Sequence, residues 1–179
     1  MDKMRFVFPC EAYEQRAVYY IQEFIGHGSA INGTGGLDRF LRDSTYGAWL
    51  EKVRADTDLA NVPEGRSPGY TYFYVRESDG ELVGMINIRL ALVGDFMREQ
   101  GGHFGYSVRP TQRGKGYATA MLRGALAFCS AIGMNDFVVG CHKANPTSAG
   151  VITNCGGVLE AEFFSEYYGQ VVQRYRIHL

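Results

Sequence analysis

The chain has 179 residues, of which 46% are hydrophobic and 21% charged, and its formal net charge is -1. This length suits one domain with a buried core, and the composition excludes a disordered chain. The near-neutral charge excludes a general affinity for nucleic acid or acidic lipid. The sequence shows neither an apolar run that could cross a bilayer nor a signal-peptide block, so we expect a cytoplasmic protein without nucleic-acid or membrane partners.

Helical periodicity marks two segments in the N-terminal part of the chain. A helix is expected over roughly Glu11–Ile25, where apolar residues recur at helical spacing and Gly26 provides a stop. The stretch GHGSAINGTGG that follows is typical of a loop. A second amphipathic helix is expected around Trp49, and NVPEGRSPG then connects it to the next element.

From Tyr70 onward the pattern changes to that of strands. The segments YTYFYVRE and ELVGMINIRLALV flank an Asp79-Gly80 turn and are followed by the short strand GHFGYSV. A helix to about Ala131, the strand DFVVGCH and the helix NPTSAGVITNC come next. Two strands around a turn at Gly169 close the chain. This order predicts a mixed α/β or α+β domain around a central sheet, with a right-handed crossover and parallel neighbours between Ser107 and His142.

The cysteines and histidines do not indicate a disulfide framework or a metal site. No C-x-x-C pair occurs and no secretory context is visible, so reduced thiols are expected. The histidines lack ligand spacing, which argues against a metal ion. The residues concerned are Cys10, Cys129, Cys141, Cys155, His27, His103, His142 and His178.

A basic, glycine-rich turn stands where the strand GHFGYSV becomes a helix. Its residues are Arg113, Gly114, Lys115 and Gly116. Glycines let an anion approach the unpaired N–H groups of a helix N-terminus, and the basic side chains add positive charge. A phosphate or pyrophosphate site is one interpretation, and a tight joint with solvated basic side chains is the other. The P-loop and dinucleotide patterns both fail, because Gly116 follows Lys115 and Thr119 replaces the last glycine.

This turn resembles the signature [QR]-x-x-G-x-[GA] of the GNAT superfamily of acyl-CoA N-acetyltransferases, with Arg113, Gly116 and Ala118 at the defining positions. The resemblance extends over about residues 81–162, and the first 65 or so residues match only loosely. It implies a single domain over residues 1–179, with an acyl-CoA-binding segment at about 103–157. The implied fold has a mixed central sheet, helices on both faces and two splayed parallel strands at the centre.

The resemblance also implies how acetyl-CoA, the cosubstrate, would bind. Pantetheine would lie along the strand edge at Tyr106, Ser107 and Val108, and the acyl thioester would enter between GYSV and FVVGC. The Val108 N–H would contact the thioester oxygen, and Asn145 matches a helix-capping asparagine near the pantetheine. The pyrophosphate would sit on the amides of Arg113, Gly114, Lys115, Gly116, Tyr117 and Ala118.

The catalytic positions of the family are not kept. Many members carry a tyrosine acid where this chain has Ile152, and some carry a glutamate base where it has Gly140. His103 is then the first candidate for the general base and His142 the second, although each could equally be a surface histidine. Cys141 is expected to be a buried thiol rather than a nucleophile.

The implied function is transfer of an acetyl group from acetyl-CoA to a primary amine by direct attack in a ternary complex. One alternative is an acyl-CoA sensor that has lost catalysis, and another is a helper domain that docks a protein through its aromatic N-terminal half. Tyr167 and Tyr168 are acceptor-site groups or ordinary packing residues. The sequence does not identify the acceptor, and the family resemblance also allows a homodimer.

Overall fold

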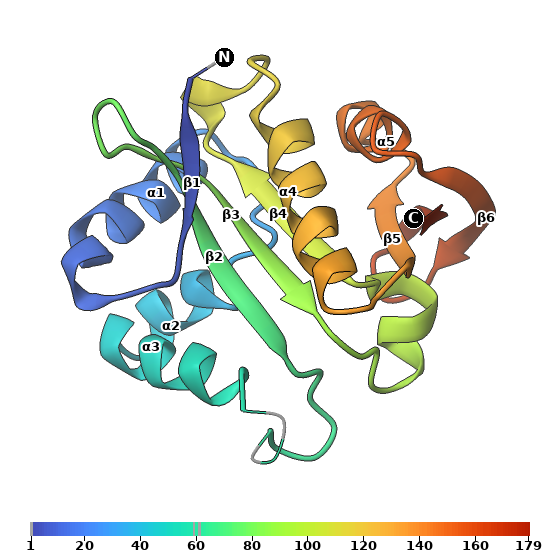
Figure 1. Ribbon diagram of the computed structural model, residues 1–179, viewed down its shortest axis with the longest axis horizontal. Coiled ribbons are helices and arrows are strands. Elements are labelled where there is room, and N and C mark those ends of the chain that lie inside the picture. Colours follow the sequence, from blue (N-terminus) through green and yellow to red (C-terminus); the bar gives the residue numbers. More distant parts are fainter. Residues whose placement is uncertain (1, 59, 61) are drawn as a thin grey trace.

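The computed structural model describes residues 2–58, 60 and 62–179, and in this part of the chain the strands form two antiparallel sheets (Figure 1). The order of the first sheet is β1-β2-β3-β4, and that of the second is β5-β7-β6. The strands of the first sheet are β1 (Met4–Val7), β2 (Gly69–Arg76), β3 (Leu82–Arg89) and β4 (Phe104–Val108). Those of the second are β5 (Asp136–His142), β6 (Val158–Ser165) and β7 (Gln170–His178).

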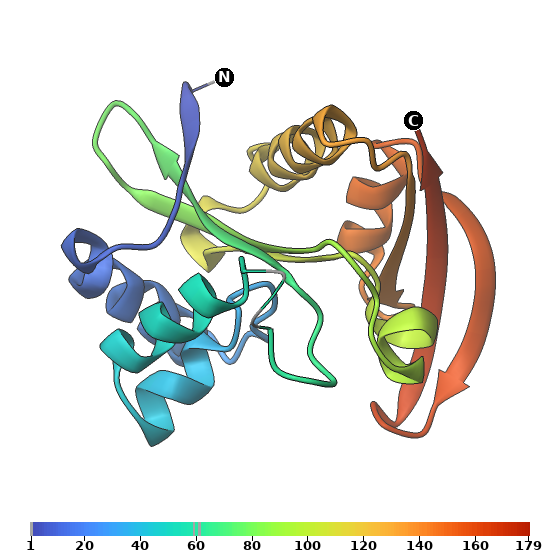
Figure 2. The ribbon, with the colours of Figure 1, turned by 60° about the horizontal axis from the view of Figure 1, so that its bottom comes forward.

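Helices cover both faces of the first sheet. Figure 2 shows the N-terminal helices, in blue and cyan, on one face and α4 on the other. On the first face lie α1 (Glu14–Gly26), α2 (Leu37–Asp43) and α3 (Tyr46–Ala55), with α1 preceded by a short 3-10 turn, Glu11–Tyr13. The remaining helical elements are a π-helical turn η2 (Met97–Gly101), a 3-10 turn η3 (Pro110–Gln112), α4 (Tyr117–Ala131) and α5 (Pro146–Thr153).

The alternation along β2 and β3 builds a separate core on each face. Phe73 and Met85 are opposite each other in the ladder and pack with α1 and α3. The neighbouring residues Tyr74 and Ile86 point the other way, into the core that α4 completes. Helical periodicity was sufficient to find α3, since Trp49 and its apolar neighbours are buried against this sheet. None of the helices in the described residues is long and apolar enough to cross a membrane.

The two sheets separate between β4 and β5. At the start of β4 the His103 N–H donates to the Val138 carbonyl at 2.7 Å, and an isolated bridge joins Gly102 to Val139. Beyond this point the described parts of β4 and β5 share no ladder and belong to different sheets. The mixed α/β class expected from the sequence is present, and the gap expected between GYSV and FVVGC lies here, but in the described residues no parallel ladder joins β4 to β5.

Candidate active site

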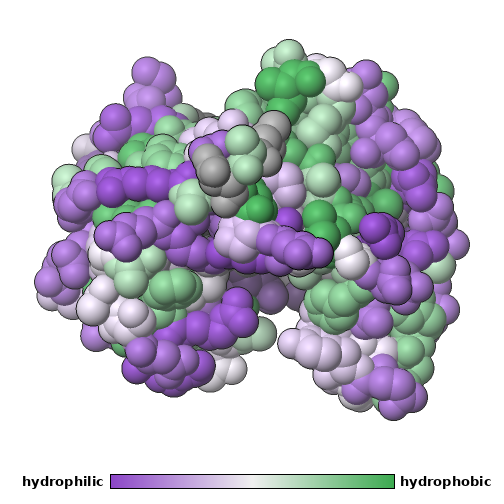
Figure 3. Space-filling view, turned by 90° about the horizontal axis from the view of Figure 1, so that it is seen from below, coloured by the Kyte–Doolittle hydropathy of each residue, from purple (hydrophilic) through white to green (hydrophobic). Residues whose placement is uncertain are grey.

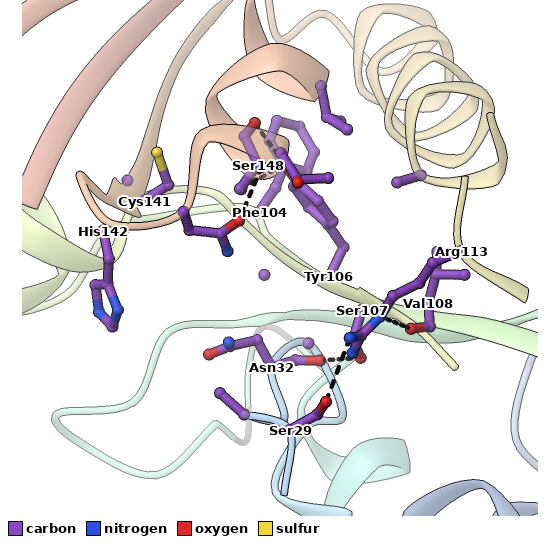
Figure 4. Close-up of a pocket in the computed structure, with 18 of the residues that line it drawn as sticks. Ser29, Asn32, Phe104, Tyr106, Ser107, Val108, Arg113, Cys141, His142 and Ser148 are labelled. Atoms are coloured by element: carbon purple, nitrogen blue, oxygen red, sulfur yellow. Dashed lines mark hydrogen bonds between the residues drawn. The ribbon is translucent and has the colours of Figure 1, made fainter. Parts of the chain in front are cut away.

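A cavity of about 570 Å³ lies where β4 and β5 separate. This volume falls in the range of small-molecule sites. The surface is indented between the two lobes of the molecule (Figure 3), and the close-up in Figure 4 shows β4 side chains facing the start of α5 and the end of β5. The turn before α4, residues of the loop 29–33 and parts of η2 complete the lining.

The free edge of β4 presents to this cavity backbone groups that do not pair with β3. His103 and Arg109, at the two ends of the strand, form backbone hydrogen bonds with β3 at 2.8 and 2.9 Å. Because backbone groups of successive residues point to opposite sides of a strand, the even-numbered residues turn their N–H and C=O away from β3. These residues are Phe104, Tyr106 and Val108, and all three line the cavity.

The edge of β4 leads into the glycine turn and the N-terminus of α4. Gly114 and Gly116 adopt φ values of 78° and 79°, and Gly116 is the N-cap residue of the helix. Within the described chain, no side chain caps this end of α4, so the amides of its first turn remain available. Tyr117 and Ala118, the first helical residues, line the cavity beside the two glycines. The sequence prediction of an exposed helix N-terminus at this turn agrees with this geometry.

The two basic residues of the turn have different surroundings. Arg113 lines the cavity, where its Nε donates to the Val108 carbonyl at 3.1 Å and its guanidinium lies 5.3 Å from the centre of the Phe24 ring. Lys115 instead donates to the Gln112 side chain at 2.9 Å and lies outside the described lining residues. Arg113 is therefore brought to the cavity, and Lys115 is not.

Tyr106 and Ser148 form a pair of hydroxyl groups inside the cavity. Their oxygens lie 2.9 Å apart, with Tyr106 reaching from β4 to α5 (Figure 4). Burial raises the pKa of Tyr106, and the hydrogen bond to Ser148 opposes that effect. The Ser148 N–H in turn donates to the Asn145 side chain at 3.1 Å, so Asn145 is a helix cap as expected. Burial also raises the pKa of the neighbouring Cys141 thiol to about 11.

The Ser107 side chain points to the opposite face of β4. Its hydroxyl lies 3.0 Å from that of Tyr20 and donates to the Asn32 carbonyl. Ser107 therefore turns its backbone groups toward β3 and uses its side chain to hold the loop that carries Asn32.

The two histidine candidates are separated by the structure. His103 lies outside the described cavity lining, and its Nδ1 accepts the Val138 N–H at 2.9 Å. Burial lowers the pKa of His103, which favours its neutral form. His142 does line the cavity, at the end of β5, with its ring centre 4.7 Å from that of Tyr168. In Figure 4 its ring points away from Cys141, toward the side of Asn32.

The two positions where the family carries an acid or a base are closed. A Cβ on Gly140 would lie 2.5 Å from the Gln100 carbonyl oxygen, because η2 packs directly on this part of β5. Ile152 is completely buried in the core beneath α5. Gly140 itself lines the cavity, but a side chain there would overlap the Gln100 backbone unless η2 moved.

The charged side chains that line the cavity in the described structure are basic. Among the described residues that line it, none is an aspartate or a glutamate, whereas Arg89 and Arg113 are both present. Within residues 2–58, 60 and 62–179, no three His, Cys, Asp or Glu side chains are grouped so that they could hold a metal ion.

Sequence reasoning did not single out Ser148 and Arg89. Ser148 occupies the last position of the N-x-x-[AS] motif that begins at Asn145, so the signal was present in the sequence. Arg89 has no such signal, because an arginine at the end of an alternating strand is usually a solvated residue. Only the fold places it at the cavity.

Comparisons with known proteins agree with this geometry. The family described as "Acetyltransferase (GNAT) domain" matches residues 37–158. None of the curated proteins matches the chain. Solved structures resemble it over nearly its whole length at low identity. The microcin C7 self-immunity acetyltransferase MccE, in complex with acetyl-CoA and AMP, has a TM-score of 0.72 and 15% identity, covering 100% of this chain and 94% of the other.

Two further structures share the fold. The ribosomal-protein-S5-alanine acetyltransferase from Vibrio fischeri has a TM-score of 0.71 and 15% identity, covering 98% of this chain and 91% of the other. The spermidine/spermine N-acetyltransferase SpeG from Vibrio cholerae has a TM-score of 0.63 and 14% identity, covering 98% and 93%. Since the family match spans more than half of the sequence and includes the glycine turn, the chain belongs to the GNAT acetyltransferase family, acyltransferases that use acetyl-CoA as cosubstrate.

Proposed function

We propose that the protein transfers an acetyl group from acetyl-CoA to a primary amine, which attacks the thioester directly in a ternary complex. The observation that carries this proposal is the continuity of the open β4 edge with the uncapped N-terminus of α4 in one cavity. A flexible amide-containing arm that ends in a diphosphate fits such a surface. The arm adds hydrogen bonds to a strand edge, and the diphosphate accepts from helix amides.

In the proposed binding mode, the residues of the turn hold the diphosphate. The amides from Gly114 to Ala118 surround it, since the Arg113 N–H already donates to the Pro110 carbonyl at 3.3 Å, and the glycines keep Cβ atoms away from its oxygens. Arg113 adds positive charge while its Nε fixes the position of the turn against Val108. Asn145 holds the start of α5 beside the pantetheine arm.

The direction of β4 decides which backbone N–H meets the thioester. Val108 is the last residue of the strand and lies next to the turn, whereas Tyr106 lies about 7 Å farther along the edge. Because the acetyl group is at the opposite end of the arm from the diphosphate, the Tyr106 N–H is the better placed donor for the developing oxyanion. We therefore move this role from Val108, where the family resemblance put it, to Tyr106, and assign Val108 to the arm.

The departing thiolate requires a proton, and the Tyr106–Ser148 hydroxyl pair is the proposed source. An alkyl thiol has a pKa of about 8.5, so a weak acid within reach is sufficient. Cys141 is assigned no covalent step, because a thiol with a pKa of about 11 is almost entirely protonated at neutral pH. Direct attack by the amine follows from this assignment.

The attacking amine must lose a proton, and His142 is the proposed acceptor. A lysine-like amine has a pKa of about 10.4, so it arrives mainly as a cation. His142 lines the cavity at the carboxyl end of β5, whereas the other candidate, His103, uses its Nδ1 to hold the Val138 amide. We retain His103 only as a positioning residue.

A catalytically impaired acyl-CoA sensor is the second candidate. It is favoured by Gly140 and Ile152, which stand where the family resemblance places a glutamate base in some members and a tyrosine acid in many. The two functions share the donor site and differ in turnover.

Calorimetric titration with CoA, combined with thiol release from acetyl-CoA over a broad panel of amines, separates these functions. Binding with thiol release supports the transferase, and binding without release from any amine supports the sensor. Gly114→Asp should abolish binding. Gly133→Asp is the matched control, since both glycines have positive φ and no described atom within 4 Å of an added Cβ. Equal affinity in the two variants would refute the proposed donor site.

A further inference from the structure

Arg89 places a positive charge in the part of the cavity away from the glycine turn. It is the last residue of β3 and lines the cavity. Its Nη1 donates to the Gly102 carbonyl at 2.9 Å, and within the described chain it forms no ion pair. Burial lowers the pKa of Arg89, which means that its charge is poorly solvated. A guanidinium in this state is stabilised by an anion.

The Arg89 side chain lies against a glycine on the adjacent strand. A Cβ on Gly105 would lie 3.7 Å from Nη2 of Arg89 and 3.3 Å from the backbone of Gly33. Gly33 itself approaches so closely that its own Cβ would lie 2.3 Å from the Gly105 carbonyl oxygen. Arg89 is therefore held between β4, the loop containing Gly33 and the cavity.

Within residues 2–58, 60 and 62–179, no acidic side chain pairs with Arg89. The described lining residues include Arg89 and Arg113 but neither aspartate nor glutamate. The Arg113 guanidinium is directed to Val108 and Phe24, beside the turn proposed for the diphosphate. The acceptor half of the cavity thus carries an uncompensated cation. A polyamine would meet like charge here, whereas an anionic substituent would meet the opposite charge.

Taking the proposed acetyl transfer as given, we infer that the acceptor amine also carries a carboxylate, as an amino acid does, and that this carboxylate pairs with Arg89. The Gly102 carbonyl orients the guanidinium through Nη1, and among the described residues neither Nη2 nor Nε has a hydrogen-bond partner. Two donors on one edge of a guanidinium match the two oxygens of a carboxylate. Tyr168 and Phe96, with ring centres 5.9 Å apart, form an aromatic wall for the body of the acceptor.

The test uses product probes that differ only in this charge. The twenty N-acetyl-L-amino acids and their uncharged carboxamides are titrated by calorimetry into the protein, both free and saturated with CoA. At least one acid should bind about tenfold or more tightly than its amide. Arg89→Met should remove this preference, and Arg89→Lys, which keeps the charge without the planar fork, should retain only part of it. Arg42→Met is the control, because Arg42 is an exposed residue paired with Asp43.

Equal binding of every acid and its amide would overturn the inference, as would a preference that survives in Arg89→Met. Faster acetylation of spermidine than of any amino acid would also overturn it. CoA affinity and thermal melting of each variant show whether it folds. If the wild-type protein did not bind CoA, the proposed transferase function would be refuted. If it bound CoA but showed no preference for acids over amides, only the inference of a carboxylate on the acceptor would be refuted.

Discussion

The hydroxyl oxygens of Tyr106 and Ser148 lie 2.9 Å apart and join β4 to α5 across the opening between the sheets. If this pair protonates the departing thiolate, Ser148→Ala should lower kcat by about 10- to 100-fold at unchanged CoA affinity. Thr153→Ala is the control in the same helix, because the Thr153 hydroxyl bonds only to carbonyls of its own helix. Steady-state kinetics with calorimetry provides both quantities.

The pair also predicts a non-additive response. Tyr106→Phe removes the other hydroxyl, and two groups that act as one unit cost no more together than the worse variant costs alone. The double variant with Ser148→Ala should therefore be about as slow as the slower single variant. Losses in kcat that multiply would show that the hydroxyls act independently.

Arg113 is expected to act through geometry as well as charge. Arg113→Lys keeps a cation but loses the Nε donor to the Val108 carbonyl. We expect it to weaken CoA binding nearly as much as Arg113→Met, by about tenfold, equivalent to about 1.4 kcal/mol. Lys115→Met should cost less than about threefold, because Lys115 contacts Gln112 outside the cavity. If Arg113→Lys bound CoA as tightly as the wild type, the contribution of Arg113 to CoA binding would come from its charge alone.

Any side chain at Gly140 should lower the free energy of unfolding. An alanine Cβ there would lie 2.5 Å from the Gln100 carbonyl, and overpacking of this kind lowers the free energy of unfolding by about 1–3 kcal/mol. Gly150→Ala is the matched control in α5, where no described atom lies within 4 Å of the added Cβ. It should raise that free energy by about 0.5–1 kcal/mol, since glycine disfavours a helix interior. Urea denaturation measures both, and equal effects would contradict the packing at Gly140.

Stability should decrease at mildly acidic pH because of His103. Burial holds its pKa in the folded protein below the value of about 6.5 expected for the unfolded chain. As the pH falls through 6.5, the unfolded chain binds this proton before the folded one, so stability is lost until the folded pKa is reached. The free energy of unfolding should fall less between pH 7.5 and 5.5 in His103→Asn than in the wild type. His178→Asn is the control, because the His178 side chain is exposed. If His103→Asn showed the same pH dependence as the wild type, His103 would not be the cause of the acid-induced loss of stability.

The elements with strong periodicity were predictable from the sequence. Both α1 and α3 bury apolar residues on one face, and in α3 these are Tyr46, Trp49, Leu50 and Val53. The glycine turn was also predictable, because an exposed helix N-terminus after a strand depends on local sequence. These features need no information about distant parts of the chain.

The elements that depend on distant partners were missed. Strand β1 has four residues without a fully buried side chain and exists through its pairing with β2. Helix α2 buries only Leu37, and η2 lies at a position set by the packing of Gln100 on Gly140. The sequence ranked His103 before His142 but could not show which of them lines the cavity, since that depends on how β4 splays from β5.

The contact between Gly33 and Gly105 has a consequence for how acceptor preference could change. Main chain rests on main chain at this point, and the loop is also held by the Ser29 hydroxyl, which accepts from Arg113, and by Ile31, which packs on the core under α1. Exchanging only the side chains of Ala30 and Asn32, which line the cavity, should then alter what the enzyme acetylates while donor binding is kept. Sequence changes at these loop positions, in natural variants or in laboratory libraries, could therefore change the acceptor without changing the donor.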